Sequence, residues 1–233
     1  MNIAENIERI RAEITEAAEK TGRRGRDITL VAASKMNDTE NVRQAIAAGV
    51  DACGENRVQE MLQKLEENAY TGAPLHFIGH LQKNKLKSVV GRVALIQSAD
   101  SPELIRLIDS QARKLGLVQD ILLEVNIGGE DNKTGMTLDM LPLALETAAA
   151  LEAVRVRGLM TIPPISTDSE KNRGYFAQMR QLFIDISGKK YNNNVIMDFL
   201  SMGMSADFYD AILEGANMVR VGSAIFGARH YTK

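Results

Sequence analysis

The sequence predicts a single (β/α)₈ TIM-type barrel with an extra N-terminal helix, with residues 1–233 forming one domain. Short apolar runs alternate with amphipathic stretches along the whole chain, and no long linker or low-complexity tract separates them. Eight such units in 233 residues favour a closed barrel, which commonly takes about 250 residues. An open doubly wound sheet is the alternative if two of the strands are misassigned.

The spacing of the apolar residues predicts the individual elements. Ile3, Ile7, Ile10 and Ile14 recur every three or four positions, which predicts an amphipathic helix that ends before Gly22. The segment at 28–33 is apolar at nearly every position, as is typical of a strand in a parallel sheet that is covered on both faces. The predicted strands are 28–33, 51–54, 75–79, 93–98, 119–126, 154–160, 195–201 and 218–221. Helices or helical turns are predicted to follow them at 39–48, 57–67, 83–90, 102–115, 138–151, 175–186, 206–214 and 224–226.

The composition excludes several classes of protein. The formal net charge is −2 and the two signs are interleaved, which argues against a broad basic surface for nucleic acid. Cys53 is the single cysteine, so the chain has neither an internal disulfide nor a thiolate zinc cluster, as fits a reducing compartment. The start of the chain is too charged for a signal peptide, and no apolar run approaches the roughly 20 residues that cross a bilayer. We therefore expect a soluble cytoplasmic protein that binds neither nucleic acid nor a membrane.

Lys35 directly follows the first predicted strand, and α/β folds carry their chemistry at the carboxyl ends of parallel strands. Desolvation disfavours the ammonium form, so a partly buried lysine there loses its proton more readily and can attack a carbonyl group. A solvated lysine is the more common outcome at such a position, because strands lead into exposed loops. Lys35 is a candidate for imine formation that needs supporting partners.

Two further candidates follow the second and third predicted strands. Asn56 lies in a polar segment before a predicted helix, where its side chain can point into a pocket or cap the helix. His80 follows a glycine and can stack on a ligand or hydrogen-bond to it. Metal binding is not expected, because no matching set of histidines and carboxylates accompanies His80.

Two loops are candidate walls of a site. The loop at 126–136 is polar and glycine-rich, so Asn126 or Lys133 can close over a site, although a solvated loop explains the composition equally well. The adjacent Pro163 and Pro164 stiffen the loop after the sixth predicted strand. That loop is expected to form a rigid wall.

Hydroxyl groups and glycines end both of the last two predicted strands. Ser201, Met204 and Ser205 lie in the first of these turns, and Gly222 and Ser223 lie in the second. Backbone amides at a helix start bind anions, and the loops after the seventh and eighth strands of such barrels are a recurrent phosphate site. Each turn alone also resembles an ordinary helix cap, so the prediction of a phosphate site rests on the pair.

Arg220 lies inside the last predicted strand, where its permanent charge needs a partner. That partner is either a structural carboxylate or a ligand. A lysine able to form an imine, a phosphate-binding pair of turns and an inward arginine together describe a pocket for a phosphorylated aldehyde. Pyridoxal 5′-phosphate (PLP) is the obvious candidate.

On these residues the chain resembles the family of pyridoxal phosphate homeostasis proteins, small barrels related to the amino-terminal domain of alanine racemase. The resemblance covers almost the whole chain, and five ordered motifs make a chance likeness improbable. The motifs are VAASK at 31–35, GENRVQE at 54–60, FIGHLQKNK at 77–85, LSMGMSAD at 200–207 and VRVGS at 219–223.

The resemblance implies a cofactor site for PLP. Lys35 would hold PLP as an internal aldimine, and Arg220 would face the pyridine nitrogen. Ser205 and the Gly222–Ser223 turn would hold the phosphate, while Asn56 and Met204 would line the ring pocket. With the two other candidates of these motifs, the expected cofactor-binding set is Lys35, Asn56, His80, Ser201, Met204, Ser205, Arg220, Gly222 and Ser223. No catalytic residue and no metal ligand are expected.

An arginine beside the pyridine nitrogen has a chemical consequence. A guanidinium cannot accept the ring proton, so it disfavours the pyridinium form that makes PLP a strong electron sink. Carbanion chemistry is therefore expected to be weak. Arg57 departs from the pattern, because many relatives are expected to carry an aromatic residue there. The resemblance therefore does not fix the shape of that side of the pocket.

The function implied by the resemblance is PLP homeostasis, as a buffer, carrier or regulator without robust catalytic turnover. Apo PLP enzymes are candidate recipients. A PLP-dependent racemase or decarboxylase is the first alternative, since relatives with this barrel catalyse both reactions. Racemisation needs a second base, which in the alanine racemases is a tyrosine from an additional β-domain, and a chain ending at Lys233 leaves no room for that domain. The missing domain also removes a dimerisation surface, which favours a monomer.

A phosphate-sugar aldolase with a Schiff-base lysine is the second alternative. It shares the barrel and the phosphate site. Its lysine lies on a later strand beside acidic partners, and Lys35 has no such partner nearby in the sequence.

Overall fold

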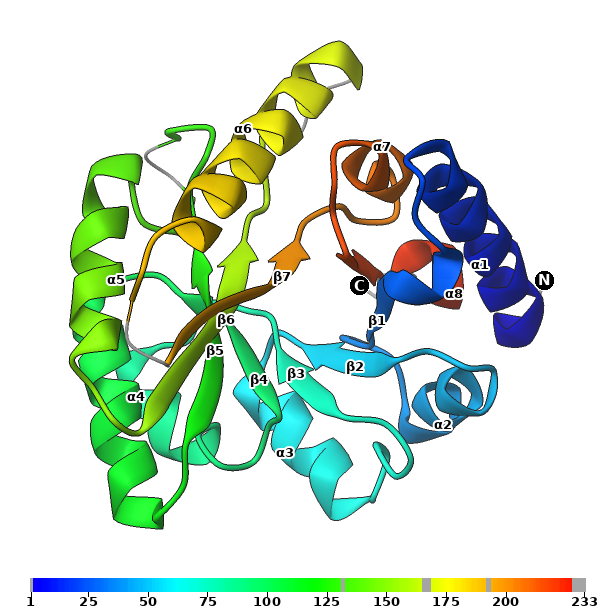
Figure 1. Ribbon diagram of the computed structural model, residues 1–233. Helices are drawn as coiled ribbons and strands as arrows, with labels where there is room; N and C mark the ends of the chain where they lie inside the picture. Colours follow the sequence, from blue (N-terminus) through cyan, green and yellow to red (C-terminus); the bar gives the residue numbers. More distant parts are fainter. Residues whose placement is uncertain (1, 131–132, 165–168, 192–193, 228–233) are drawn as a thin grey trace.

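The computed structural model describes residues 2–130, 133–164, 169–191 and 194–227. Within them, parallel strands close into a barrel in chain order, with the last strand paired to the first (Figure 1). The strands are β1 Thr29–Ala33, β2 Ala52–Glu55, β3 Leu75–Phe77, β4 Leu95–Ala99, β5 Gln119–Glu124, β6 Val154–Met160, β7 Val195–Ser201 and β8 Met218–Val221. The predicted closed barrel is confirmed, and the open doubly wound sheet is excluded.

The helices lie around the outside of the strands (Figure 1). They are α1 Ile3–Lys20, α2 Thr39–Ala47, α3 Val58–Glu66, α4 Pro102–Leu115, α5 Leu141–Ala149, α6 Ser169–Ser187, α7 Phe208–Leu213 and α8 Ser223–Phe226. The extra N-terminal helix α1 begins with a capping box between Asn2 and Glu5, and it buries the isoleucine face that the spacing predicts. It packs beside α7, α8 and α2 and so covers the seam where the barrel closes (Figure 1).

The helix predicted at 175–186 is longer, since α6 begins at Ser169, and two other predicted helices differ in kind. The segment predicted at 83–90 is the short 3₁₀ helix η2, Lys83–Ser88, because Leu86 is its one buried residue and its lysines offer no apolar stripe to pack. The segment predicted at 138–151 divides into the 3₁₀ turn η3, Leu138–Met140, and the helix α5. Pro142 lies in the first turn of α5, where the missing N–H costs no hydrogen bond.

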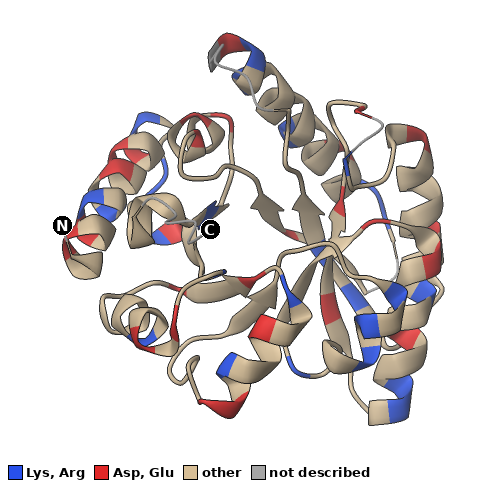
Figure 2. Ribbon diagram, turned by 180° about the vertical axis from the view of Figure 1, so that it is seen from behind, with Lys and Arg blue, Asp and Glu red and all other residues tan. Residues whose placement is uncertain are grey.

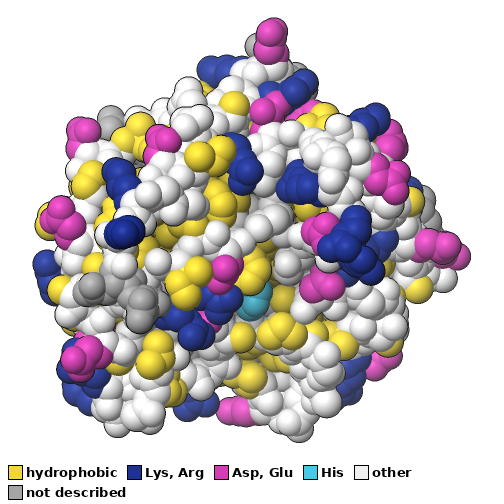
Figure 3. Space-filling model, in the orientation of Figure 1, with side chains coloured by type: hydrophobic (Ala, Val, Ile, Leu, Met, Phe, Trp, Pro, Cys, Tyr) yellow, Lys and Arg dark blue, Asp and Glu magenta, His cyan; other side chains and the backbone are white. Residues whose placement is uncertain are grey.

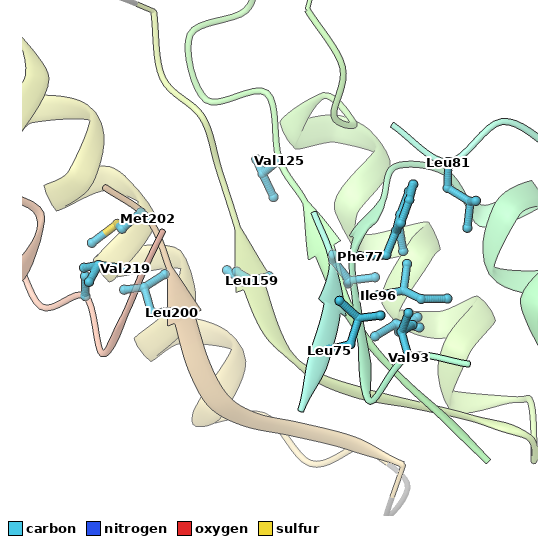
Figure 4. Packing of buried hydrophobic residues seen from close by; sticks show 14 of the residues in the cluster. Leu75, Phe77, Leu81, Val93, Ile96, Val125, Leu159, Leu200, Met202 and Val219 are labelled. Carbon is cyan, nitrogen blue, oxygen red and sulfur yellow. The ribbon is translucent and has the colours of Figure 1, made fainter. Parts of the chain in front are cut away.

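Alternate residues of the strands form two apolar layers. The outer layer fills the space between barrel and helices, and Figure 4 shows Leu75, Phe77 and Ile96 gathered there. The inner layer is small and fills the barrel itself; it consists of Val31, Ala52, Leu95, Leu122, Met160 and Met218. Arg220 is paired with Val31 across β8 and β1, so its side chain enters the barrel interior from the wall of the inner layer.

The outer surface carries charges of both signs. Both basic and acidic residues lie along the helices (Figure 2), and they are interspersed with hydrophobic side chains on the face shown in Figure 3. In the part of the chain that the structure describes, no helix is long and apolar enough to span a membrane. The same residues contain no cluster of three or more histidine, cysteine or acidic side chains placed to hold a metal ion.

Candidate functional site

A cavity opens at the carboxyl ends of β6, β7, β8 and β1. Its empty volume is about 970 Å³ with its solvent-filled mouth included, which is in the range of small-molecule sites. The described residues that line it are Ala33, Lys35, Ile162, Pro163, Pro164, Asn172, Gly203, Met204, Ser205, Ala206, Asp207, Arg220, Gly222 and Ser223. This is the end of the barrel at which the sequence placed the chemistry.

The structure brings together most of the predicted cofactor-binding residues. Six of the nine line this cavity: Lys35, Met204, Ser205, Arg220, Gly222 and Ser223. Asn56 and His80 line a neighbouring cavity after β2 and β3, and Ser201 lies buried beneath Arg220. Whether these residues bind a cofactor stays a prediction.

Arg220 forms the floor of the cavity and is only 2% exposed. Its Nη1 donates to the Ser201 hydroxyl at 2.5 Å, and its Nη2 donates to the Thr161 carbonyl oxygen at 2.8 Å. Burial lowers the pKa of Arg220 to about 10, and the carboxylates of Glu124 and Asp207 oppose that shift, so the side chain is a cation at neutral pH. Within the described chain two of its five N–H donors are used by these side-chain bonds, which leaves donors for a ligand.

A buried chain of hydrogen bonds supports Arg220 from inside the barrel. The Ser201 hydroxyl donates to Gln97 Oε1 at 2.7 Å, and Gln97 Nε2 lies 3.0 Å from His76 Nδ1. Because the amide nitrogen is a donor, Nδ1 accepts and the neutral imidazole carries its proton on Nε2. Burial lowers the pKa of His76 to about 4, so the ring stays neutral. Ser201 therefore fixes Arg220 rather than lining the cavity.

The neutral His76 predicts a loss of stability in mild acid. In the unfolded chain histidine takes up a proton near pH 6.5, whereas in the fold it resists until about pH 4, so the unfolded state binds more protons between these values. The free energy of unfolding should fall by about 2–3 kcal/mol from this group alone between pH 7 and pH 4.5. Urea unfolding of wild type and His76→Gln at both pH values measures it. An equal pH dependence of the two proteins would contradict the assignment, since the buried carboxylates titrate in both.

The last two turns meet at one hydroxyl group. Ser205 Oγ accepts from the backbone amides of Gly222 at 3.1 Å and of Ala224 at 3.2 Å. Gly203 makes the first turn possible: its φ is +92°, and an added Cβ would lie 2.6 Å from the Ala211 Cβ. Ser205, Gly222 and Ser223 all line the cavity, and hydroxyl and amide groups at such turns bind phosphate oxygens, so these turns are compatible with the predicted phosphate site.

The proline loop forms the predicted wall of the cavity. Pro163 and Pro164 line it together with Ile162. Lys133 donates to the Pro163 carbonyl oxygen at 3.0 Å, so the long loop after β5 holds this wall in place. Asn126 instead bonds to Glu130 within its own loop. Of the two residues suggested to close over a site, Lys133 reaches the wall.

A second cavity of about 770 Å³ lies after β2 and β3. Asn56 lines it and does not cap α3, whose N-cap is Arg57; among the described residues Asn56 Oδ1 has no hydrogen-bond partner. His80 is exposed, and its Nδ1 lies 3.1 Å from Asp100 Oδ2. Arg57, Gln59, Gln82 and Lys85 complete the polar lining.

The sequence reasoning missed the residues that support the site from behind. Gln97 and Thr161 hold Arg220, directly or through Ser201, and a buried group around Lys64 lies under the chain at Lys35. The sequence held a signal for Gln97 and for Glu55, which belongs to the group around Lys64. Both are polar residues inside otherwise apolar strands, where a buried polar group needs a partner.

Comparison with known proteins identifies the family and supports the fold. The family model described as alanine racemase, N-terminal domain, matches residues 2–230. A curated relative from Aquifex aeolicus, named pyridoxal phosphate homeostasis protein, is 42% identical over 99% of this chain and 100% of its own length.

Two solved structures resemble the fold over nearly the whole chain. PipY of Synechococcus elongatus PCC7942, solved with PLP bound, is 31% identical with a TM-score of 0.82, covering 97% of this chain and 100% of that one. An alanine racemase of Clostridium difficile 630, in complex with cycloserine, shares the fold at 17% identity and a TM-score of 0.73. The match covers 100% of this chain and 60% of the racemase. This chain therefore belongs to the family of pyridoxal phosphate homeostasis proteins, whose barrel is that of the alanine racemase N-terminal domain.

Proposed function

We propose that this protein binds PLP through an aldimine with Lys35 and acts in PLP homeostasis, as a buffer or carrier without robust catalytic turnover. One observation carries the proposal: Lys35, Arg220, Ser205 and the Gly222–Ser223 turn line a single cavity at the carboxyl end of the barrel. PLP bound to the related PipY and the names of the curated relatives support the choice of ligand.

The residues present fit this ligand. Lys35 would supply the amine that adds to the aldehyde carbon, and the aldehyde oxygen would leave as water. The Ser205 hydroxyl, which accepts from the amides of Gly222 and Ala224, can donate its own proton to a phosphate oxygen. The buried Arg220 would supply N–H donors to the pyridine nitrogen from the floor of the cavity.

The same residues support binding without turnover. When bound to a protein, PLP supplies an electron sink for carbanion chemistry, and that sink is strongest when the ring nitrogen is protonated. Arg220 can only donate to that nitrogen, so it keeps the ring unprotonated. In the described part of the cavity lining, the ionisable side chains are Lys35, Asp207 and Arg220, and Asp207 Oδ1 already accepts from the Met204 amide at 2.6 Å.

Replacing Lys35 tests the covalent link. Purified wild-type protein incubated with PLP should gain an absorbance band at the edge of the visible range, and borohydride should reduce the adduct and fix the cofactor to the chain. Lys35→Ala should lose both signals because Lys35 is the one lysine among the described residues that line the cavity. Lys114→Ala, an exposed lysine on α4, is the matched control and should keep them. A band that survives in Lys35→Ala would refute the assignment.

A turnover assay separates the carrier from an enzyme. The loaded protein is incubated with single enantiomers of amino acids, and the mixture is analysed by chiral chromatography and for release of carbon dioxide. The proposal expects neither sustained racemisation nor decarboxylation. Sustained turnover that disappears in Lys35→Ala would replace the carrier by a PLP-dependent racemase or decarboxylase. Transfer to an apo PLP enzyme, our expectation for the physiological partner, is measured by recovery of that enzyme's activity.

A further inference from the structure

The peptide groups on both sides of Lys35 are held by side chains of α3. Lys64 Nζ donates to the carbonyl oxygen of Ser34 at 2.8 Å. The backbone N–H of Met36 donates to Glu60 Oε1. A third contact fixes Lys35 itself, since its carbonyl oxygen accepts from Asn37 Nδ2 at 3.0 Å. The backbone is thus fixed before, at and after the lysine.

These contacts belong to a largely buried ionic cluster in which every N–H donor of Lys64 is engaged. Lys64 is 4% exposed, and its three N–H donors meet three acceptors: Ser34 O, Glu55 Oε1 at 2.7 Å and Glu60 Oε1 at 2.8 Å. The Ser34 hydroxyl also donates to Glu55 Oε1, at 2.7 Å. Because every donor of the ammonium group is engaged, Lys64 has no freedom to change its direction, and the carbonyl that it holds is equally fixed.

The turn after Lys35 is unfavourable by itself and needs contacts that stabilise it. Met36 has φ +62°, a left-handed conformation that costs a residue with a side chain roughly 1–2 kcal/mol. Its side chain is half exposed, so burial of the methionine does not offset that cost. The bond from its N–H to Glu60 does act on this conformation, because it fixes the peptide between Lys35 and Met36. The left-handed turn decides where the chain leaves the strand and hence where the Lys35 side chain points.

We propose that Glu60 and Lys64 are positioning residues, which together with Glu55 clamp the chain at Lys35 and aim its amine into the cavity. None of the three lines that cavity. The clamp acts on covalent capture and leaves the recognition of ring and phosphate to Arg220 and the two terminal turns. This inference rests on the proposed aldimine with Lys35.

Two ligands separate positioning from a merely structural role. PLP carries the aldehyde that Lys35 attacks, whereas pyridoxine 5′-phosphate has the same ring and phosphate but an alcohol in its place. A misdirected lysine weakens the capture of PLP alone. A loosened cavity weakens the binding of both ligands.

The central variant is Glu60→Ala, which removes the acceptor for the Met36 amide. We expect the apparent Kd for PLP to rise about 10- to 100-fold, because capture needs the amine in place against the aldehyde carbon, and a misplacement of about 1 Å can cost a reaction about 100-fold. The Kd for pyridoxine 5′-phosphate should change less than about 2-fold, since the groups that bind ring and phosphate are untouched. Glu60→Gln keeps a carbonyl oxygen for the Met36 amide and should restore most of the PLP affinity.

Glu66→Ala is the matched control, an exposed glutamate on the same helix, and should bind both ligands like wild type. Asn37→Ala removes the third contact without touching the buried ions, so it keeps the test open if Glu60→Ala does not fold. It should weaken PLP about 3-fold and leave pyridoxine 5′-phosphate unchanged.

The outcomes are distinct. Equal weakening of both ligands in Glu60→Ala, or no change in either, would overturn the clamp while leaving the proposed function intact. Wild-type protein that binds PLP without forming the borohydride-reducible link would instead overturn the proposed function, and the clamp with it. Selective loss of PLP capture, rescued by Glu60→Gln, supports both.

Discussion

Gly158→Ala is expected to destabilise the barrel by more than about 4 kcal/mol, or to prevent folding, because a side chain there meets the backbone of the neighbouring strand. Gly158 lies in β6 opposite Phe199 of β7, at a shift in the strand register. Its φ is +145°, and an added Cβ would lie 1.8 Å from the Phe199 carbonyl oxygen. The clash involves backbone, so β6 and β7 would have to separate. Chemical unfolding followed by circular dichroism measures the loss.

Gly174→Ala is the matched control with the opposite sign. Gly174 lies exposed in α6, and an added Cβ meets no atom within 4 Å. Alanine restricts the unfolded chain and favours the helix, so this variant should be more stable by about 0.5–1 kcal/mol. A loss of stability in Gly158→Ala no larger than about 1 kcal/mol would mean that the barrel relaxes at this bulge.

The second large effect is expected from Lys64→Met, which leaves Glu55 buried without its cation. Glu55 is fully buried, and Lys64 Nζ lies 2.7 Å from its Oε1. Breaking a buried ion pair by removing one partner typically costs about 3–5 kcal/mol. The urea midpoint of the variant should fall accordingly. Lys114→Met, at an exposed position on α4, should change stability by less than about 0.5 kcal/mol.

The loss in Lys64→Met should depend on pH in one direction. Burial already raises the pKa of Glu55, and removal of the cation raises it further. A carboxyl group whose pKa is raised by folding does not lower the free energy of unfolding at a pH below its unfolded pKa. It lowers that free energy increasingly as the pH rises toward its folded pKa. The variant should therefore lose less stability at pH 5 than at pH 8. Glu55→Gln combined with Lys64→Met should recover part of the loss, whereas strictly additive effects would speak against the pair.

The sequence predicted the elements well where the alternation of apolar runs and amphipathic stretches was clear. The closed barrel follows from the βα alternation, and the bounds of β6, β7 and β8 agree residue for residue with the prediction. The helices predicted at 83–90 and 138–151 are shorter than predicted, because the local composition does not support an α-helix over the whole segment. The lysine-rich segment at η2 has too few apolar residues for an α-helix, and Pro142 sets where α5 begins.

The candidate site divides in the same way. Lys35, Ser205 and Gly222 were predictable because the carboxyl ends of parallel strands meet at one end of a barrel. The place of Ser201 could not be predicted in this way. Successive residues of a strand point to opposite faces, so the direction of the Ser201 side chain depends on where the strand ends. Its hydroxyl contacts Gln97 and Arg220 in the barrel interior.

By itself, the sequence determined the fold class, the family and the end of the barrel that carries the site, since all three depend on order and spacing along the chain. Only the tertiary structure decided that Asn56 and His80 line a separate cavity, and that Lys64 and Glu60 hold the backbone at Lys35. These contacts join residues 24 or more positions apart in the sequence. Hydrogen bonds of this kind depend on where a helix docks against a strand, and periodicity along the chain carries no information about that.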